Sequence, residues 1–390
     1  MSKPGERPKR PETAVVTAGR SPFDHHGLVN PPVYHASTLL HRTMDALENR
    51  TQPYSYGRRK TPTIEALETA IRELDGGAET VLCPSGLQAC TLALLTVASA
   101  GDHILVTDSV YGPTRTFCDR TLARFGVTTT YFDPLIGAGI ETLFKANTRA
   151  VFLESPGSLT FDVQDVPAIA AAAHAANIHV IVDNTWATPL FFDAIGHGAD
   201  LTVIAATKYV VGHSDAMLGT VTATDKLAKQ LRETHGNLGL TTGPDDIYLG
   251  QRGLRTMAVR LNQHQATAKR IAEWLQTRPE VARVLYPALP TDPGHEIWKR
   301  DFKGASGLFG VELKPCSKAA LAAMLDGMSL MGMGWSWGGY ESLIVPAHPH
   351  RTAKKFEHQG PLIRIHAGLE NADDLIADLD AGLDRLKKTA

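Results

Sequence analysis

The sequence predicts an α/β fold with a mostly parallel sheet between helices, followed by a smaller C-terminal α+β domain. Short apolar runs alternate with helical patterns from about residue 80 to residue 222, as in a series of βαβ crossovers. A long helical pattern over residues 254–275 then leads to a second set of strand-like runs. We therefore divide the 390 residues into an extended N-terminal arm (1–60), an α/β domain (61–255) and a C-terminal α+β domain (256–390).

The composition is that of an ordinary globular protein, with 43% hydrophobic and 21% charged residues. A formal net charge of −2 gives no electrostatic reason to expect nucleic acid or an anionic membrane as a partner. The four cysteines form no C-x-x-C pair, and no apolar run resembles a secretion signal or a bilayer span. The 16 histidines never show H-x-x-x-H or H-E-x-x-H spacing. We expect a cytoplasmic protein without a metal site and with neither a nucleic-acid nor a membrane partner.

The N-terminal arm lacks sustained periodicity and ends in the segment Tyr54–Lys60, which mixes aromatic and guanidinium side chains. Such an arm can cover a neighbouring subunit, or it can be a simple loop. A helix follows, with Thr61 as its N-cap, Pro62 at its first position and Gly76-Gly77 at its end.

Seven apolar runs predict the strands of the α/β domain, at residues 80–83, 103–107, 127–132, 149–154, 178–183, 201–205 and 218–222. Helices are predicted between them at about residues 86–97, 113–125 and 166–175, with a short helix before residue 149. In the C-terminal domain, strands are predicted at residues 282–286, 307–313 and 362–367. The last helix is predicted to bury Ala372, Ile376, Leu379, Leu383 and Leu386.

Two strand ends carry residues that suit covalent chemistry. Lys208 follows the strand 201–205, and open α/β sheets bind ligands at the carboxyl ends of their strands. Apolar surroundings lower the pKa of a lysine, and a partly neutral amine is what Schiff-base chemistry requires. The alternative is a lysine that caps its strand and points into water. Asp183 ends another strand of the same sheet, although an aspartate there can also cap the next helix. An amine and a carboxylate together suit pyridoxal phosphate, whose aldehyde needs the amine and whose ring nitrogen needs the acid.

Phosphate donors are available nearby. The segment Ser85-Gly86-Leu87 lies at a strand-to-helix junction, where backbone N–H groups and the helix dipole favour an anion. Many helix starts look the same, so this signal is weak by itself. Thr207 could add a hydroxyl, and Tyr56 and Arg58 could add a phenol and a guanidinium group.

Three further features suit a binding site. Tyr111 follows a strand end and could stack on the cofactor ring, or it could be an ordinary half-buried tyrosine. Arg364 lies in an apolar strand, where it could hold a substrate carboxylate or form a structural ion pair. The loop Trp335–Glu341, which contains Ser336 and Trp337, suits a site wall, although such aromatic density is also common at subunit interfaces.

Together these segments resemble the Cys/Met-metabolism family of fold type I pyridoxal-phosphate enzymes, from about residue 12 to the C-terminus. The matching segments are Tyr54–Arg58, Pro84–Gly86, Asp108–Gly112, Leu153–Ser158, Val182–Thr185, Ala206–Tyr209 and Gly212–Asp215. The resemblance implies the fold type I transferase architecture with a seven-stranded sheet. It implies that pyridoxal 5′-phosphate is bound covalently to Lys208, with Asp183 on the ring nitrogen and Tyr111 stacked on the ring. It further implies that Gly86, Leu87 and Thr207 hold the phosphate, helped by Tyr56 and Arg58 from a partner subunit of a homotetramer.

Within the family, the segment Trp335–Leu343 resembles that of the bacterial β-eliminating lyases, whereas γ-acting relatives typically carry leucine at position 337. This implies β-elimination of L-cystathionine, and possible use of L-cystine, to release homocysteine, pyruvate and ammonia in methionine biosynthesis and transsulfuration. The catalytic residues would be Lys208, Tyr111 and Asp183, and the substrate-binding residues Arg364, Ser336, Trp337, Tyr111 and Tyr56. The alternatives are a sister γ-lyase or γ-synthase, a cysteine or cystine desulfhydrase, and a regulatory protein that binds the cofactor. Ala205 replaces a serine that many relatives use on the phosphate, as it does in those β-lyases.

Overall fold

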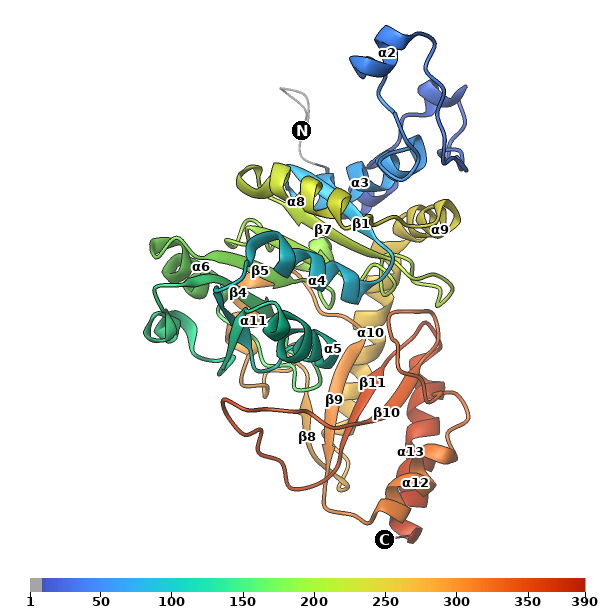
Figure 1. The fold of residues 1–390 in the computed structure, drawn as a ribbon. Helices are drawn as coiled ribbons and strands as arrows, with labels where there is room; N and C mark the ends of the chain where they lie inside the picture. The colour runs from blue at the N-terminus through green and yellow to red at the C-terminus, as the bar shows by residue number, and fades with distance from the viewer. Residues whose placement is uncertain (1–8, 390) are drawn as a thin grey trace.

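The computed structural model describes residues 9–389 and contains two sheets joined by a long helix (Figure 1). The larger sheet has seven strands in the order β1-β7-β6-β5-β4-β2-β3. Strands β6, β5, β4, β2 and β3 pair in parallel, and β7 runs antiparallel to both β6 and β1. The strands are β1 (Glu79–Cys83), β2 (His103–Thr107), β3 (Thr128–Phe132), β4 (Thr148–Glu154), β5 (His179–Asp183), β6 (Leu201–Ile204) and β7 (Gly219–Ala223). The predicted fold class and the seven-stranded, mostly parallel sheet are confirmed.

Both faces of this sheet are buried, which is why its strands are continuous apolar runs in the sequence. Leu82 packs into one hydrophobic core, while its neighbours Val81 and Cys83 pack into a second core on the other face. Helices α4 (Gly86–Val97) and α8 (Asp225–Asn237) contribute to the second core, and α3 (Pro62–Asp75) and α6 (Val166–Ala175) contribute to the first. The predicted N-cap of α3 is confirmed, because Thr61 Oγ1 accepts the Ile64 N–H at 3.3 Å.

The remaining elements around this sheet are short. The predicted helix 113–125 consists of α5 (Gly112–Thr116), which continues into a π-helical stretch, Phe117–Leu122. A 3₁₀ stretch (Gly137–Leu143) and α7 (Thr188–Phe191) complete the set. None of the helices within residues 9–389 is both long and apolar enough to cross a bilayer.

The N-terminal region is only partly an extended arm. Residues Pro11–Thr17 form α1, which packs against α3 and α10 and buries Val15, and Ala18 just beyond it is also buried. A helix of seven residues is too short for its periodicity to be visible in the sequence. The chain then leaves the body through a 3₁₀ turn (Pro22–His25) and α2 (Met44–Glu48), and Figure 1 shows this segment projecting from the body.

The predicted helix 254–275 begins later than expected and is preceded by another helix. Helix α9 (Pro244–Leu254) ends in a turn in which the Thr256 N–H donates to the Gly253 carbonyl, and α10 (Met257–Leu275) starts afresh. Arg255 lies at this break, and its guanidinium donates to the carbonyls of Val15 and Ala18 at 2.8 Å. The side chain of Arg255, at the break between the two helices, is therefore held by a contact with the α1 region. No local sequence pattern indicates this contact.

The smaller sheet is antiparallel, in the order β10-β11-β9-β8. Its strands are β8 (Val281–Leu285), β9 (Leu308–Leu313), β10 (Leu343–Ala347) and β11 (Leu362–His366), and its helices are α11 (His295–Asp301), α12 (Lys318–Asp326) and α13 (Ala372–Thr389). Strand β10 was not predicted, because Pro346 argues against a strand and is tolerated here only at a sheet edge.

The predicted buried face of α13 is partly wrong. Leu379, Leu383 and Leu386 are buried as expected, but Ala372 and Ile376 are only half-buried. Leu375 is fully buried instead, so the helix is rotated slightly from the predicted orientation.

Asp75 makes the stability of the α/β domain depend on pH. It ends α3, and its Oδ2 accepts hydrogen bonds from Thr202 Oγ1 at 3.0 Å and Thr222 Oγ1 at 2.7 Å. Burial raises the pKa of Asp75 to about 6. Because the folded pKa exceeds the unfolded value, the stabilisation by its proton is complete below about pH 4 and is lost as the pH rises through 6.

We predict that Asp75→Asn gains stability relative to the wild type by about 3 kcal/mol between pH 4 and pH 7, because the amide carries no buried charge. Urea unfolding of both proteins across this range measures the difference. Asp326→Asn, at the exposed end of α12, serves as the control. A difference between Asp75→Asn and wild type that does not change with pH would contradict the prediction.

Candidate active site

The carboxyl ends of β5 and β6 bring Asp183 and Lys208 to one edge of the large sheet. The two strands are parallel neighbours, and Asp183, the last residue of β5, pairs with Val203. Strand β6 ends at Ile204, and a turn in which the Lys208 N–H donates to the Ala205 carbonyl at 3.0 Å places the lysine just beyond the edge. The structure therefore brings together the amine and the carboxylate that the sequence places on two strand ends.

The side chain of Lys208 contacts the C-terminal loop. Its Nζ donates to Ser336 Oγ at 2.8 Å and lies 5.2 Å from the ring centroid of Trp337. Burial, with a contribution from the charge of Arg364, lowers the pKa of Lys208 to about 8, and the Asp183 carboxylate opposes this shift. The amine is therefore neutral in roughly one molecule in ten at pH 7, which is far more than for an exposed lysine.

Asp183 is almost fully buried, with 8% of its surface exposed. Its Oδ1 accepts the Thr185 N–H at 3.0 Å and the Thr185 hydroxyl at 2.5 Å, and the Cys90 thiol lies 3.6 Å from Oδ2. Burial raises the pKa of Asp183, while the two bonds from Thr185 favour the ionised form. These bonds fix the orientation of the carboxylate at the sheet edge.

The N-terminus of α4 provides the predicted anion cradle on the same edge, after β1. Ser85 is the N-cap, and its Oγ accepts the Gln88 N–H at 3.1 Å. The first N–H groups of a helix have no acceptor within the helix, so those of Gly86 and Leu87 can bind an anion. A Cβ on Gly86 would lie 2.4 Å from the Cβ of Ala205, so a glycine is required for this close approach.

Thr207, which is predicted to help hold the phosphate, has its hydroxyl bonded to the backbone. Its Oγ1 donates to the Leu218 carbonyl at 3.1 Å and accepts the Leu218 N–H at 2.8 Å. The hydroxyl thus ties the turn after β6 to the segment before β7, and it would have to redirect its proton to reach an anion.

Arg364 lies on β11 with only 8% of its surface exposed and supports the loop that contacts Lys208. Its Nη2 donates to the carbonyls of Gly334, Trp335 and Ser336 at 3.0–3.3 Å. These contacts leave Nε and Nη1 free of the loop. Within the described residues Arg364 makes no ion pair, so the structural ion pair considered as an alternative is absent, and burial lowers the pKa of Arg364 to about 10.

The same loop packs on the backbone of Lys208. Gly338 has a φ of +84°, and a Cβ at this position would lie 3.0 Å from the backbone of Lys208. The Gly338 N–H donates to His366 Nε2 at 3.1 Å. Trp337 packs edge-on against Tyr209, with ring centroids 5.5 Å apart. The loop Trp335–Glu341 is therefore held by contacts with the Lys208–Tyr209 segment and with His366 of β11.

Tyr111 lies at the start of α5 and is 45% exposed. Its backbone N–H donates to Glu154 Oε2 at 2.6 Å. Burial raises the pKa of the Tyr111 hydroxyl, the negative charge of Asp183 reinforces this rise, and the charge of Arg364 opposes it. Because Glu154 pairs with Asp183 on the adjacent strand, the hydrogen bond to Glu154 places Tyr111 at the same edge of the sheet as the other predicted residues.

Tyr56 and Arg58 are not brought into this cluster by their own chain. Arg58 Nη1 donates to the Gly236 carbonyl at 3.0 Å, near the end of α8, and Tyr56 is half-exposed beside it.

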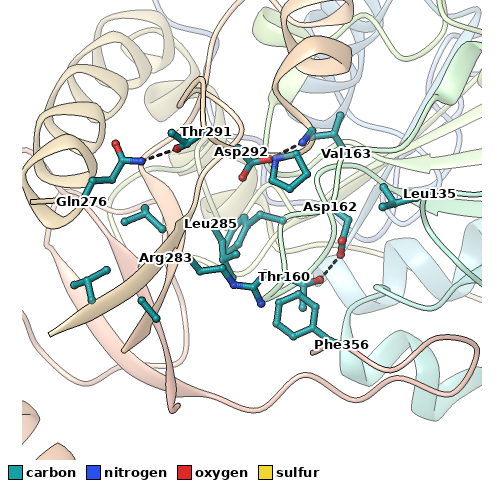
Figure 2. Close-up of a pocket in the computed structure, with 16 residues that line it drawn as sticks. Leu135, Thr160, Asp162, Val163, Gln276, Arg283, Leu285, Thr291, Asp292 and Phe356 are labelled. Atoms are coloured by element: carbon teal, nitrogen blue, oxygen red, sulfur yellow. Dashed lines mark hydrogen bonds between the residues drawn. The ribbon is translucent and has the colours of Figure 1, made fainter. Parts of the chain in front are cut away.

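A cavity of about 340 Å³ lies apart from the cluster, between the segment 160–163 and β8 (Figure 2). None of the predicted site residues lines it. Its polar groups bond to each other: Gln276 Nε2 donates to Thr291 Oγ1 at 2.6 Å, and the Gly294 N–H donates to Asp292 at 2.8 Å. We therefore place the active site at the sheet edge.

Sequence reasoning missed four polar residues that complete the cleft. Thr185 and Cys90 orient Asp183, His366 holds the loop, and Glu154 holds Tyr111. Glu154 could have been found, because it ends β4 just as Asp183 ends β5. The other three are recognisable only once distant segments are packed together.

This donor set fits pyridoxal phosphate. A desolvated amine can condense with the aldehyde, a buried carboxylate on the adjacent strand can pair with the ring nitrogen, and the α4 N-terminus can take the phosphate. Gly86 is half-buried and Leu87 is exposed, so the start of α4 is open to a phosphate. On a doubly covered α/β sheet, these features define a pyridoxal-phosphate-dependent enzyme.

The chain belongs to the Cys/Met metabolism PLP-dependent enzyme family, whose model matches residues 12–384. A protein of Rhizobium johnstonii is 52% identical over 375 residues, covering 95% of each chain. The cystathionine β-lyase of Escherichia coli is 46% identical and covers 97% of this chain and 99% of its own. The crystal structure of cystathionine γ-synthase from Xanthomonas oryzae pv. oryzae superposes with a TM-score of 0.92 at 32% identity, covering 98% of this chain and 100% of that one. The family resemblance inferred from the sequence is confirmed.

We predict that Lys208 reacts with aldehydes at a pH well below that of an ordinary lysine, because its lowered pKa supplies neutral amine. In the cofactor-free protein, the rate of pyridoxal attachment, trapped with borohydride, should be half-maximal near pH 8. Peptide mapping identifies the modified residue. Attachment at Lys208 that rises only near pH 10.5, the usual lysine value, would contradict the prediction.

Proposed function

We propose that this protein is a cystathionine β-lyase, which releases homocysteine, pyruvate and ammonia from L-cystathionine and serves methionine biosynthesis and transsulfuration in the cytoplasm. The observation that carries the proposal is the contact of Lys208 with Ser336 and Trp337. This contact puts the loop that resembles the β-eliminating lyases directly against the reactive amine. The 46% identity to the Escherichia coli cystathionine β-lyase supports the same choice.

The cofactor would be held by residues already described. Lys208 would carry it covalently, Asp183 would pair with its ring nitrogen, and Tyr111 would cover one ring face. Its phosphate would bind the N–H groups of Gly86 and Leu87, and the Thr207 hydroxyl after its proton is redirected. When bound, pyridoxal phosphate supplies an aldehyde for amino groups and a protonated ring that accepts electrons from the α-carbon of an amino acid.

Arg364 would bind the α-carboxylate of the substrate. Its Nη2 is occupied by the loop carbonyls, so Nη1 and Nε are the donors left for a carboxylate, and the cationic charge strengthens each hydrogen bond they make. This guanidinium is buried and has no carboxylate partner in the described chain. An incoming carboxylate would therefore bind a desolvated cation.

Lys208 would act as the general base at the α-carbon of the substrate. An amine with a pKa of about 8 is partly neutral at neutral pH and can accept a proton, which an amine of pKa 10.5 seldom can. The hydroxyl of Ser336, 2.8 Å from Nζ, would aim the amine. Lys208 or Tyr111 would then protonate the departing sulfur of homocysteine.

We predict that the protein forms pyruvate and homocysteine from L-cystathionine, and that Lys208→Ala lowers kcat/KM by at least about 10³-fold because the base is lost. Chromatography of the 2-oxo acid product measures pyruvate separately from 2-oxobutyrate, and a thiol reagent measures homocysteine. Lys229→Ala, at an exposed position of α8, is the matched lysine control. Release of 2-oxobutyrate would indicate a γ-acting enzyme, and release of pyruvate and sulfide from cysteine or cystine but not from cystathionine would indicate a desulfhydrase.

We also propose that the active unit is at least a dimer, within a tetramer built as a dimer of dimers. The projecting segment exposes large apolar side chains that a monomer would leave in water, including Phe23 at 94% and Leu40 at 89%. Tyr56 and Arg58 end this segment. Their own chain does not bring them to Lys208. They would therefore complete the active site of a neighbouring subunit, by binding the phosphate of its cofactor.

We predict that two inactive variants restore activity when they share a dimer. Lys208→Ala lacks the base and Arg58→Ala lacks the phosphate contact, so a hybrid dimer contains one site with both residues intact. After co-refolding of equal amounts, activity should reach about one quarter of the wild-type value. Activity no higher than the sum of the two separate variants would show that Arg58 serves its own subunit's site.

A further inference from the structure

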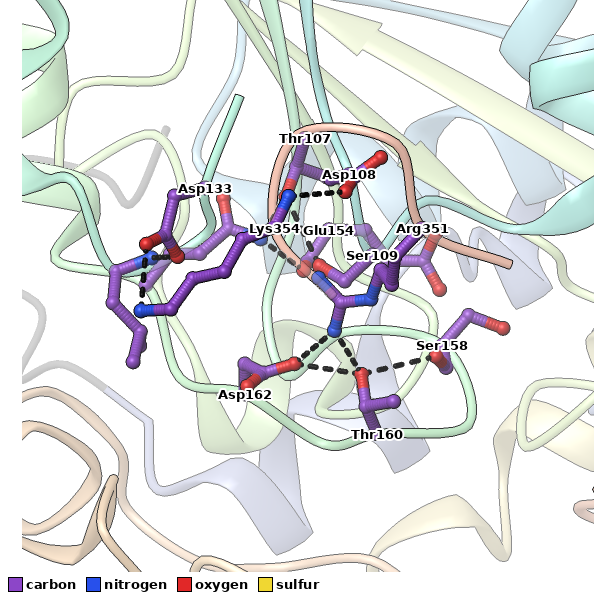
Figure 3. A network of polar contacts seen from close by, with 12 residues as sticks. Thr107, Asp108, Ser109, Asp133, Glu154, Ser158, Thr160, Asp162, Arg351 and Lys354 are labelled. Carbon is purple, nitrogen blue, oxygen red and sulfur yellow. Dashed lines mark hydrogen bonds and ion pairs between the residues drawn. The ribbon is translucent and has the colours of Figure 1, made fainter. Parts of the chain in front are cut away.

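Glu154 is a second carboxyl group at the edge where Asp183 lies, and the proposed reaction gives it no role. It ends β4, and its Cα pairs with that of Asp183 on the adjacent parallel strand β5. Side chains in register on neighbouring strands project from the same face, about 4.8 Å apart at the backbone. Figure 3 shows Glu154 within the polar network that joins β2, β4 and the C-terminal segment around Arg351.

Glu154 is also bonded to the other side of the cleft. Its Oε2 accepts the backbone N–H of Tyr111 at 2.6 Å, which fixes the start of α5. Its own backbone carbonyl accepts Gln164 Nε2. The side chain therefore lies between Asp183, which would hold the ring nitrogen of the cofactor, and Tyr111, which would cover the ring.

The two carboxyl groups accept different numbers of hydrogen bonds, and this difference decides which of them carries a negative charge. Asp183 has three donors, two from Thr185 and one from Cys90, whereas the Glu154 carboxyl has the Tyr111 N–H. Neighbouring carboxylates with few donors cannot both be ionised at low cost, so one retains a proton.

The charged and titratable groups around Glu154 agree with this assignment. Burial and the Asp183 carboxylate both raise the pKa of Glu154 well above its usual value. The Tyr111 N–H and the charge of Arg351 oppose this rise but are weaker. Cys90 faces the same pair, and burial keeps its thiol protonated, so it adds no charge.

We propose that Glu154 is a positioning residue that works as a neutral acid: it anchors the Tyr111 backbone and leaves the single negative charge of the pair on Asp183. The proposal rests on the proposed function for the cofactor that Asp183 and Tyr111 would hold. It explains how a carboxylate can lie beside the ring-nitrogen partner without competing with it. Glutamine, which has the shape of a neutral glutamic acid and keeps an acceptor oxygen, should therefore replace Glu154, whereas alanine should not.

Titration of cofactor-free protein with pyridoxal 5′-phosphate tests the anchoring role. We expect Glu154→Ala to raise the dissociation constant about tenfold, through loss of the hydrogen bond that fixes Tyr111, and Glu154→Gln to restore most of the affinity. Glu141→Ala, at an exposed position, is the matched control. Wild-type affinity in Glu154→Ala, or an equal loss in the alanine and glutamine variants, would overturn the proposal. If the wild type itself does not bind the cofactor, the proposed function fails instead.

The protonation state is tested separately on the cofactor-free protein. The infrared difference spectrum between wild type and Glu154→Gln at neutral pH should contain the carbonyl band of a protonated carboxyl group. A carboxylate band in its place would overturn the proposal. This measurement needs only the wild type and the isosteric variant, so it remains decisive if Glu154→Ala does not fold.

Discussion

The desolvation of the Lys208 amine is the constraint on which the rest of the site depends. In water this amine would be protonated and inert, and only a covered amine is partly neutral near pH 7. The cover comes from the other sheet: the loop ending at Gly338 packs on the lysine backbone, and Ser336 and Trp337 contact its side chain. Packing of this C-terminal loop against the edge of the large sheet is therefore what creates the reactive amine.

The cleft contains two pairs of like groups, two cations and two carboxyl groups. In each pair, the charge of one member makes ionisation of the other less favourable. The charge of Arg364 helps to lower the pKa of Lys208, and the charge of Asp183 helps to raise that of Glu154. The cleft thus holds groups near neutrality that can give or take protons, next to fixed charges that bind. A substrate with a carboxylate and an amine matches this division. Its carboxylate would bind Arg364, which stays charged, and its amine would approach Lys208.

Much of the fold and the two central residues could be predicted from the sequence, because the signals are local. Buried parallel strands are visible as short apolar runs, and the strand-end rule found both Asp183 and Lys208. Strand β10 was missed because Pro346 contradicts the local pattern, and only its place at the sheet edge makes it possible. The bond between Lys208 and Ser336 joins residues 128 positions apart, and no local pattern indicates such a contact.

The C-terminal loop over Lys208, on which the proposed β-elimination rests, is anchored more firmly on its inner side than on its outer side. Its inner residues are fixed: Trp337 packs on the fully buried ring of Tyr209, and the Gly338 N–H is bonded to His366. Trp335 on the outer side is 83% exposed. The part of the loop nearest the amine is thus anchored to the core, while the outer part is exposed and would face the distal end of an incoming substrate. Discrimination at the reacting carbons would then come from fixed geometry, and recognition of the leaving group would come from the exposed rim.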